Sequence, residues 1–419
     1  MADDSGQQDD VFRLPSLVGA VSSVPGGVSL FAIDRDRIVH STYYDPRVLR
    51  PEWGPWFPIR PELRPSYWSG AWSSAGTGGG QGGMGLGGVG AVSTVPGGIS
   101  LFAIDGAGVV WSTYFDPRLA HAGWEPWFAI HPEQRFAPLD GGVSGGISPA
   151  TLATVSTVPG GISLFATDID GVVNSTYFDP RVTKPDWVSW FPIHPEKRFW
   201  PIGPVTAVSS VPGGVSLFAV DRDGIVMSTY YDPRQANPDW VPWFPIHGDH
   251  RFRGIGTKVV LAVSSVPGGL SLFVLDGNGT VWSSYFDPRF PNANWVSWFP
   301  IHPDQGILAL SGLVSSAPGG ISLFALDQSG SVVSTYFDPR AANPSWVPWF
   351  SIHPETNFLG GQSPVAASTV PGGISLFAVG NDHAVWSSYY DPRDANPRWV
   401  PWFAIHPEKK FERLVGSFR

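Results

Sequence analysis

One unit repeated seven times constrains the fold of this chain more than any other feature of its 419 residues. Each copy runs in the same order, from a Pro-Gly-Gly turn through GGISLFAID, a D-x-x-G-type turn and VVWSTYFDPR to the ending W-x-x-W-F-x-I-H-P-E. Self-similarity at one period, here about 53 residues, indicates one architecture of equal modules rather than several unrelated domains. The prolines that mark the copies are Pro25, Pro96, Pro159, Pro212, Pro267, Pro318 and Pro371.

Four short runs within each unit predict β-strands. In the second copy they are residues 91–95, 99–105, 109–116 and 125–130, which are rich in β-branched and aromatic residues and separated by turn residues. This pattern is typical of a four-stranded antiparallel meander. The run Ile99–Ile104 is largely apolar on both faces, so its sheet must be covered on both sides by other sheets. An all-helical fold is excluded because 50 Gly and 42 Pro disfavour helix interiors.

The repeat therefore predicts an all-β, seven-bladed β-propeller in which each blade is a four-stranded antiparallel meander. We expect one propeller domain over residues 11–419, after a disordered acidic segment over residues 1–10. The start of the chain, residues 12–19, resembles residues 411–416 near its end, so the two ends are expected to meet. The alternative, a linear β-solenoid, needs dissimilar end caps, whereas the terminal units here are regular. The blades are expected at about residues 20–62, 91–133, 154–196, 207–249, 262–304, 313–355 and 366–408.

Two insertions lengthen the first two intervals of the repeat. One is Gly-rich and covers residues 73–90, and the other covers residues 139–150 and consists of small residues. Compositions of this kind are typical of flexible linkers. Both insertions are expected to be mobile surface loops.

Composition narrows the partners of the protein. A net charge of −9 with 15% charged residues argues against nucleic acid, which needs a basic surface. Cysteine is absent, which excludes disulfides and thiolate metal sites. No run approaches the roughly 20 apolar residues of a membrane span, and the acidic start lacks the apolar region of a signal peptide. We therefore expect a soluble protein without membrane insertion, cytoplasmic or released by a non-classical route. The sequence is also compatible with a homo-oligomer.

The alternating strands of a meander place recurring groups on two rims. The Pro-Gly-Gly turn and the Asp-Pro-Arg loop should share one rim, here named the Asp-Pro-Arg rim, and the D-x-x-G turn and the His-Pro-Glu linker the other, the linker rim. The arginine of Asp-Pro-Arg has two interpretations: a forked donor to sugar hydroxyls beside an aromatic platform, or part of a structural turn, stacked on Trp or paired with a carboxylate. These candidate binding residues are Arg47, Arg118, Arg181, Arg234, Arg289, Arg340 and Arg393.

Each copy also holds a pair of tryptophans three residues apart, which on a strand point to opposite faces. We assign the second Trp, such as Trp127, to packing between blades. The first adjoins the loop and is the candidate surface on which the C–H face of a sugar ring stacks. The candidate stacking residues are Trp53, Trp124, Trp187, Trp240, Trp295, Trp346 and Trp399.

Metal and catalytic sites are not indicated. One linker position holds His in six copies and Arg60 in the first, but single histidines about 50 residues apart do not form a metal site, so a linker hydrogen bond is the better interpretation. The turns at Asp168 and Asp221 are too short for calcium loops and are typical of hairpin turns. One position in the third strand varies, which indicates either unequal blades or a tolerant face: His40, Trp111, Asn174, Met227, Trp282, Val333 and Trp386.

The unit resembles the repeat of the Photorhabdus-type bacterial lectins, which are seven-bladed propellers. The likeness covers nearly the whole chain outside the two insertions and the first ten residues. It implies that fucose or O-methylated sugars bind in clefts between blades, at up to seven sites. The chain departs from that family in its Asp-Pro-Arg loop and its His-Pro-Glu ending. The shared features are Leu101-Phe102, Val110-Trp111, Tyr114-Phe115, Asp116 and the pair Trp124/Trp127.

The residues and the resemblance together give one hypothesis. We expect a multivalent carbohydrate-binding lectin with no enzymatic activity and no cofactor, whose partners are glycans or glycoconjugates. Two alternatives belong to other classes: a propeller scaffold for protein–protein interaction, and a glycan-cleaving enzyme. Catalysis would need dissimilar groups gathered where the repeat breaks, such as two carboxylates flanking one bond, and the sequence indicates no such cluster.

Overall fold

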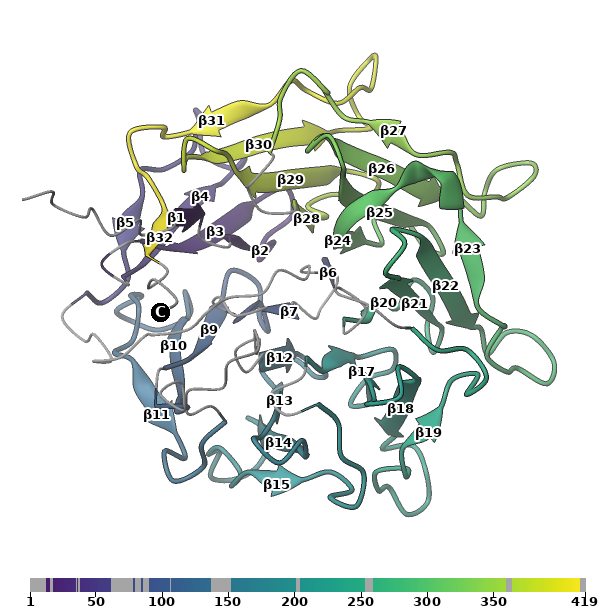
Figure 1. Ribbon diagram of the computed structural model, residues 1–419. Helices are drawn as coiled ribbons and strands as arrows, with labels where there is room; N and C mark the ends of the chain where they lie inside the picture. The colour runs from purple at the N-terminus through teal and green to yellow at the C-terminus, as the bar shows by residue number, and fades with distance from the viewer. Residues whose placement is uncertain are drawn as a thin grey trace, which may run out of the picture.

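Seven antiparallel sheets stand in a ring around one axis, each with its first strand near the axis and its fourth at the circumference (Figure 1). This computed structural model describes residues 13–15, 18–34, 36, 38–61, 78–79, 84–85, 90–105, 107–136, 152–200, 204–252, 259–358 and 364–414. The predicted seven-bladed β-propeller is confirmed. The segment expected to be disordered, residues 1–10, and the insertion at residues 139–150 lie outside the described residues.

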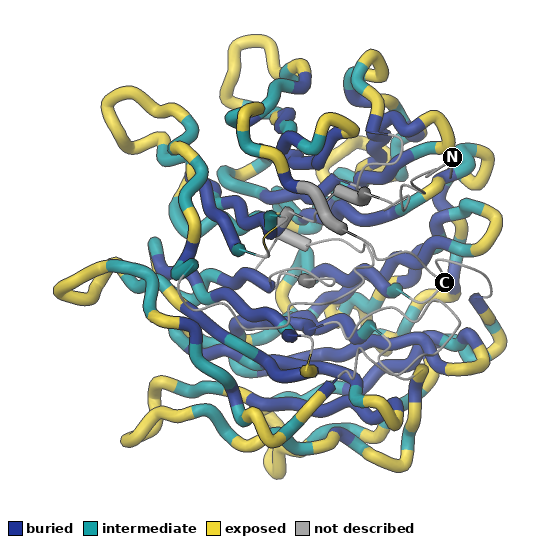
Figure 2. The backbone as a smooth tube through the Cα atoms, turned by 60° about the vertical axis from the view of Figure 1, so that its left-hand side comes forward, coloured by how far each residue is buried: buried dark blue, intermediate teal, exposed yellow. Residues whose placement is uncertain are grey.

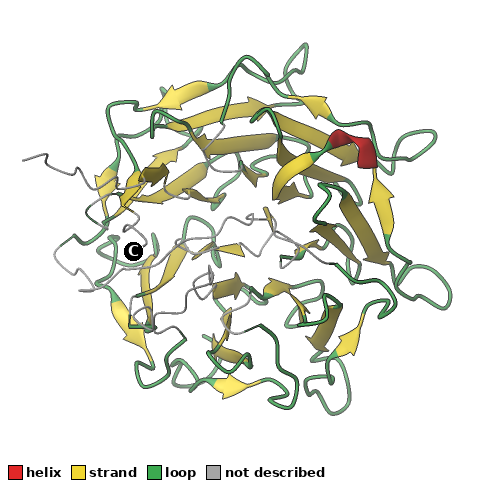
Figure 3. Ribbon diagram, viewed as in Figure 1, coloured by secondary structure: helices red, strands yellow, loops and turns green. Residues whose placement is uncertain are grey.

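The blades follow one another in chain order (Figure 1), and they are built from strands joined by loops and turns (Figure 3). Blade 1 holds β2 (Val18–Val21), β3 (Val28–Ile33), β4 (Val39–Tyr44) and β5 (Phe57–Pro58), and blade 2 holds β8 (Gly90–Val92), β9 (Ile99–Ile104), β10 (Val110–Phe115) and β11 (Phe128–Ile130). Blade 3 holds β12 (Leu152–Val155), β13 (Ile162–Thr167), β14 (Val173–Phe178) and β15 (Phe191–Pro192), and blade 4 holds β16 (Thr206–Val208), β17 (Val215–Val220), β18 (Val226–Tyr231) and β19 (Phe244–Pro245). Blade 5 holds β20 (Leu261–Val263), β21 (Leu270–Leu275), β22 (Val281–Phe286) and β23 (Phe299–Ile301), followed by the short 3-10 helix η1 (Pro303–Gln305). Blade 6 holds β24 (Ile307–Val314), β25 (Ile321–Asp327), β26 (Val332–Phe337) and β27 (Phe350–Ser351), and blade 7 holds β28 (Val365–Ala367), β29 (Ile374–Val379), β30 (Val385–Tyr390) and β31 (Phe403–Ile405).

The second strand of each blade is the centre of the hydrophobic packing, as its two apolar faces predict. In β17, Leu217 packs toward blade 3 and Phe218 toward blade 5, and neither side chain is exposed. Fully burying a side chain of this size contributes about 1.5–3 kcal/mol to folding. Seven such clusters, one between each pair of neighbouring blades, hold the ring together.

The ring is closed by the turns themselves. The amide of the first glycine of each Pro-Gly-Gly donates a hydrogen bond of 2.7–3.0 Å to a carbonyl of the preceding blade, and Gly26 of blade 1 completes the circle by donating to Thr369 of blade 7. The ends of the chain also meet, because β1 (Arg13–Pro15) pairs with β32 (Glu412–Leu414). A linear solenoid has no bond between its first and last units, so that alternative is excluded.

Part of the Gly-rich insertion does not behave as the expected surface loop. Within residues 73–90, β6 (Gly78–Gly79) pairs with the inner strand of blade 6 and β7 (Met84–Gly85) with that of blade 3, and Figure 1 shows both strands near the axis. An inner strand has unpaired N–H and C=O groups along its free edge, and glycines can approach such an edge closely. The expectation of a surface loop is therefore wrong for these four residues.

The fourth strand of blade 2 is shorter than predicted. It covers Phe128–Ile130 rather than residues 125–130, and ahead of it only a single bridge joins Trp124 to Phe115. Pro126 lies between the bridge and the strand, and proline has no N–H to donate to a neighbouring strand.

Candidate functional site

The Pro-Gly-Gly turn and the Asp-Pro-Arg loop of each blade pack against each other, so the predicted Asp-Pro-Arg rim is confirmed. In blade 1, Gly26 has φ +79°, and a Cβ atom there would lie 2.8 Å from Cγ of Pro46. Only glycine adopts that conformation without strain, and it also lets the two loops come this close. Beyond this contact the Asp-Pro-Arg loops project from the blades as exposed hairpins (Figure 2).

A cleft of about 630 Å³ opens on this rim between blades 4 and 5. Its volume is in the range of small-molecule sites. The wall from blade 4 presents Ser216, Ser228, Tyr230, Arg234, Gln235 and Phe244, and the wall from blade 5 presents Leu270, Phe286, Pro288 and Trp295. The two serines and Tyr230 share one face of blade 4 because alternate residues of a strand point the same way and Ser216 pairs with Tyr230 across the sheet.

Trp295 forms an aromatic wall of the cleft and is half-buried. Its ring meets Phe218 of blade 4 edge-on at 5.9 Å and is tilted against Phe286 of its own blade at 5.9 Å. These contacts fix the ring while leaving part of it accessible. The other six first tryptophans meet the corresponding Phe of the preceding blade in the same edge-on way, at 5.6–5.9 Å: Trp53, Trp124, Trp187, Trp240, Trp346 and Trp399.

Arg234 and Trp295 thus meet in one cleft although they come from different copies of the repeat. Trp240, the tryptophan of the same copy as Arg234, instead packs against Phe165 of blade 3. Because the other first tryptophans pack against the preceding blade in the same way, we expect each candidate arginine to lie beside the first Trp of the following blade.

The second tryptophans pack between blades as predicted. Trp298 is 8% exposed, lies 4.9 Å from the ring of Phe252 and donates its Nε1–H to the carbonyl of Ile246 at 3.2 Å. Both partners belong to blade 4 or the linker after it. The second tryptophans are therefore part of the hydrophobic packing.

The linker histidines hold the main chain beside the first tryptophans. Nε2 of His247 lies 3.0 Å from the carbonyl oxygen of Trp295 in the next blade, so this nitrogen carries the hydrogen and donates it. Five other histidines make the same contact at 2.9–3.0 Å, and Arg60 of blade 1 replaces them with its Nε at 2.6 Å. All seven residues have φ between 43° and 52°. The predicted linker hydrogen bond is confirmed.

The arginines pair with the carboxylates of their own loops. In blade 4, Nε and Nη2 of Arg234 donate to the two oxygens of Asp232 at 2.8 and 2.7 Å, and the same fork forms in all seven copies. The Arg234 side chain is still 64% exposed, and its Nη1 has no partner within the described residues. The structural interpretation therefore holds, and free donors remain for a ligand.

These ion pairs keep the loop carboxylates charged at low pH. The hydrogen bond from Arg47 is the main reason why the pKa of Asp45 falls to about 2, and Arg181 does the same for Asp179. In the other five copies the pKa of the Asp is lowered by the same cause. Each Asp–Arg pair thus keeps both of its charges at a lower pH than an unpaired aspartate would.

Sequence reasoning missed the tyrosine that lines this cleft. Tyr230 lines the cleft between blades 4 and 5, and its ring meets Phe244 edge-on at 6.3 Å. Six counterparts in the other blades are 36–49% exposed: Tyr43, Tyr114, Tyr177, Tyr285, Tyr336 and Tyr389. The signal was a Tyr that follows Ser-Thr or Ser-Ser in every third strand, two residues from an invariant Ser on the same face.

On the linker rim, the aspartate that opens each D-x-x-G-type turn binds groups of its own turn. The Asp168 carboxylate accepts the amides of Asp170 and Val172 and the Nδ2–H of Asn174, so the turn itself uses its oxygens. The variable third-strand position supplies this last donor in several blades. In blade 4, where that position is Met227, Lys197 of the linker after blade 3 bonds to Asp221 instead, at 2.9 Å.

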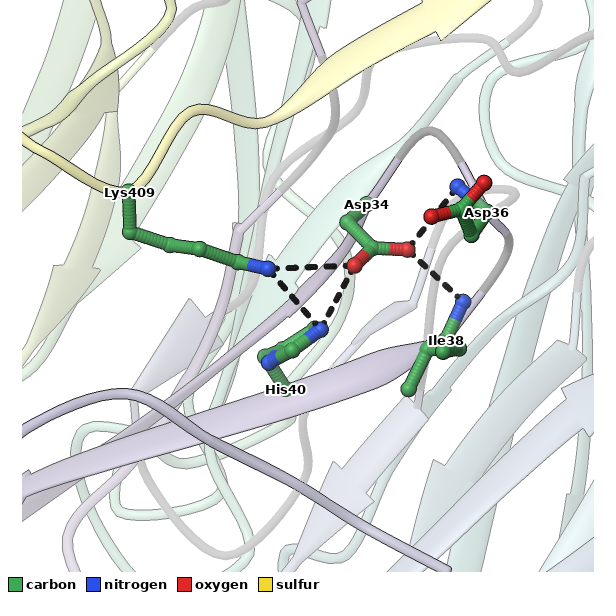
Figure 4. A network of polar contacts seen from close by, with 5 residues as sticks. All are labelled: Asp34, Asp36, Ile38, His40 and Lys409. Carbon is green, nitrogen blue, oxygen red and sulfur yellow. Dashed lines mark hydrogen bonds and ion pairs between the residues drawn. The ribbon is translucent and has the colours of Figure 1, made fainter. Parts of the chain in front are cut away.

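Blade 1 shows the same turn with a contact across the closure of the ring (Figure 4). One oxygen of Asp34 accepts the amides of Asp36 and Ile38, and the other lies 2.6 Å from Nε2 of His40 and 3.1 Å from Nζ of Lys409. Burial acts to raise the pKa of Asp34, but these hydrogen bonds outweigh burial and hold the pKa well below its ordinary value. Lys409 follows blade 7, so it ties the last blade to the first.

The described residues offer neither a cluster of metal ligands nor a membrane-spanning helix. In these ranges no group of three or more His, Cys, Asp or Glu residues could hold a metal ion. Among the same residues, no helix has the length and apolar character needed to cross a bilayer.

Comparison with solved structures finds lectin propellers. The lectin BP39L from Burkholderia pseudomallei superposes with a TM-score of 0.64 at 17% identity, covering 94% of this chain and 99% of that one. The SapL1 lectin, solved with alpha methyl fucoside, matches at 12% identity over 80% of this chain and 96% of its own, with a TM-score of 0.44. A six-bladed lectin from Aleuria aurantia matches at 11% identity over 73% and 90%, with a TM-score of 0.42. No protein-family model and no curated protein sequence matches the chain. The likeness to BP39L establishes a fold that a lectin also has.

Proposed function

We propose that the protein is a multivalent carbohydrate-binding lectin without enzymatic activity, which holds small sugars in the clefts of the Asp-Pro-Arg rim. The cleft between blades 4 and 5 carries the proposal: Trp295 and Tyr230 supply aromatic faces, and the exposed Arg234 lines the same cleft with free donors. Aromatic faces suit the C–H side of a sugar ring, and guanidinium donors suit its hydroxyl groups. The shared fold with BP39L supports the same class of function.

The lining favours a sugar with an apolar substituent. Phe244, Leu270 and Phe286 are carbon surfaces, while Ser216 and Ser228 add two hydroxyls. A methyl group gains free energy when carbon surface covers it, about 0.8 kcal/mol per buried CH₂-sized group. Fucose, with its C5 methyl, and O-methylated sugars present such a group beside ring hydroxyls. The resemblance to the Photorhabdus-type lectins points to the same two classes.

The groups in this cleft support binding rather than cleavage. Hydrolysis of a glycosidic bond needs two carboxyl groups about 5–9.5 Å apart on either side of the bond. The residues that line the cleft include a single carboxylate, Asp232, and Arg234 holds both of its oxygens. A general acid and a second carboxylate are thus missing from this described lining.

Repetition supports multivalency. The residues that line this cleft have identical or closely similar counterparts in all seven copies, with one exception developed below. Several weak sites on one rigid ring engage clustered glycans together, which raises avidity by about 10²- to 10⁴-fold where the geometry permits.

A glycan array followed by calorimetric titration with methyl α-L-fucoside tests the proposal. We expect binding to fucosylated or O-methylated glycans, with a stoichiometry of several sugars per chain and no release of reducing ends. No binding to any sugar, or a single site per chain, would refute it. Capture of a protein partner that free sugar does not inhibit would favour the scaffold alternative.

A matched pair of variants locates the sites. Replacing all seven Asp-Pro-Arg arginines by Ala should weaken sugar binding at least tenfold, because each guanidinium loses its hydrogen bonds to the ligand. The control replaces Arg135, Arg198 and Arg251, which lie on the linker rim and donate to turn carbonyls there. The control should bind as wild type does. Equal losses in both variants would place the sites elsewhere.

A further inference from the structure

One position in the cleft between blades 4 and 5 breaks the sevenfold pattern. Tyr230, Phe244 and Trp295 have identical counterparts in every copy, and the other lining residues vary only within a chemical type. Gln235, which directly follows Arg234, is the exception, because its counterparts differ in chemical type. We name this position the gate residue, and its counterparts are Val48, Leu119, Val182, Phe290, Ala341 and Asp394.

The backbone places the gate residue in the same way from blade to blade. The amide of Gln235 donates to the carbonyl of Asp232 at 3.2 Å, and the amides of Leu119, Phe290, Ala341 and Asp394 make the same bond at 3.2–3.3 Å. Each side chain therefore starts from an equivalent point beside its cleft. What differs between the clefts is the chemistry at that point.

Four gate residues are large apolar side chains that face solvent. Val48, Leu119, Val182 and Phe290 are 50%, 43%, 52% and 61% exposed. Single exposed apolar residues are common on protein surfaces and need no explanation. Here they recur at one structural position, and in blade 4 the residue at that position, Gln235, lines the cleft.

We infer that the gate residue contacts the group attached to the bound sugar, and that the seven clefts therefore prefer different neighbouring groups. This inference rests on the proposed function. Clefts with an apolar gate favour a neighbour that presents carbon surface, such as an aromatic aglycone, an acetamido methyl or the C–H face of a second sugar. The Phe290 cleft should show this preference most strongly, at about two- to tenfold over the Ala341 cleft.

The cleft between blades 7 and 1 differs in charge. Its gate, Asp394, follows Arg393, whose fork is taken up by Asp391. The charges of that pair cancel, so the Asp394 carboxylate is the charge that the gate position itself adds here. This cleft should favour neighbours that carry an ammonium group, such as an unacetylated amino sugar, and disfavour neighbours that carry a carboxylate.

A variant with Ala at all six non-alanine gate positions, in which every gate residue is the same, tests the inference. These residues sit in exposed loops, so the variant should fold, and its circular dichroism and unfolding midpoint check this. Wild type and variant are compared on one array of glycans that share a terminal sugar but differ in the neighbour. We expect wild type to rank the neighbours and the variant to lose that ranking, with a ratio between best and worst that falls about two- to tenfold. An unchanged ranking in the folded variant would overturn the inference while leaving the lectin function intact.

Two further variants test the charged gate. Asp394→Ala should reduce binding to glycans with an ammonium-bearing neighbour, and Ala341→Asp should raise it. Asp249→Ala, on the linker rim, serves as the control for a lost surface charge. A control that shifts the preference as much as Asp394→Ala would overturn the role of this gate. If wild type binds no glycan on the array, the proposed function fails, and the inference fails with it.

Discussion

A buried hydroxyl in the third strand of each blade forms a hydrogen bond that two matched substitutions can test. Oγ of Ser284 donates to the carbonyl of Val296 at 2.6 Å, which fixes the segment that begins with Trp295. Ser284 is 0% exposed. Five of its counterparts are threonines that make the same bond with their Oγ1, and Ser388 is another serine. Ser284→Ala therefore removes one defined hydrogen bond, and Ser284→Thr replaces it with a version that other blades use.

The magnitude follows from the surroundings of the two groups. An intramolecular hydrogen bond contributes about 1 kcal/mol net, and a buried acceptor left without a donor costs up to about 3 kcal/mol. Val296 is 36% exposed and the bond is only partly buried, so the lower figure applies. We expect Ser284→Ala to lower the free energy of unfolding by about 1 kcal/mol and Ser284→Thr to leave it within about 0.5 kcal/mol of wild type.

Guanidinium-induced unfolding measures both variants, and a shifted midpoint with an unchanged slope reports stability. Because the bond holds Trp295, Ser284→Ala should also weaken one class of sites in a calorimetric titration with sugar, without reducing the others. Equal midpoints for Ser284→Ala and wild type would refute the role given to this bond. So would a Ser284→Thr variant as unstable as Ser284→Ala.

Three further predictions concern the ring and its rim. Gly213→Ala should lower the free energy of unfolding by about 1–2 kcal/mol in a denaturant titration, because φ there is +77° and the new Cβ would lie 3.0 Å from Pro233. Gly248→Ala is the control because a Cβ at that position has ordinary clearance, and equal losses in both variants would contradict this account. Lys409→Met should lower the unfolding midpoint more than Lys410→Met, because Lys409 binds Asp34 across blades 7 and 1 in a half-buried site whereas Lys410 forms an exposed pair. The reverse order would exclude a role of Lys409 in closing the ring. Sugar affinity, measured by titration, should stay constant from pH 8 to about 4 and decline as the pH falls toward 2. The lowered pKa values of the loop aspartates keep their arginine pairs intact until those carboxylates protonate. An affinity already lost at pH 5 would show that other groups control binding.

Much of the site could be predicted because each part of it is local in sequence. Glycine and proline at fixed offsets specify the turns, and alternation specifies the faces of each strand. The expectation that the two tryptophans of a pair point to opposite faces of a strand is wrong, because Trp295 and Trp298 precede β23 and both pack in the cluster between blades 4 and 5. Seven copies of such a unit determine the number of blades. The same locality explains why the linker histidine could be assigned to a hydrogen bond and not to a metal.

The tertiary structure decided which groups meet. Arg234 shares a cleft with Trp295 of the next blade and not with Trp240 of its own copy, and its fork is already engaged by Asp232. Pairing between neighbouring blades depends on how one sheet leans on the next, which no pattern within a single copy encodes. The free edges of the inner strands likewise exist only once the ring has closed, and the Gly-rich insertion pairs with them there. The repeat thus specified the module and how many modules there are, and contacts between modules that are distant in sequence specified the clefts.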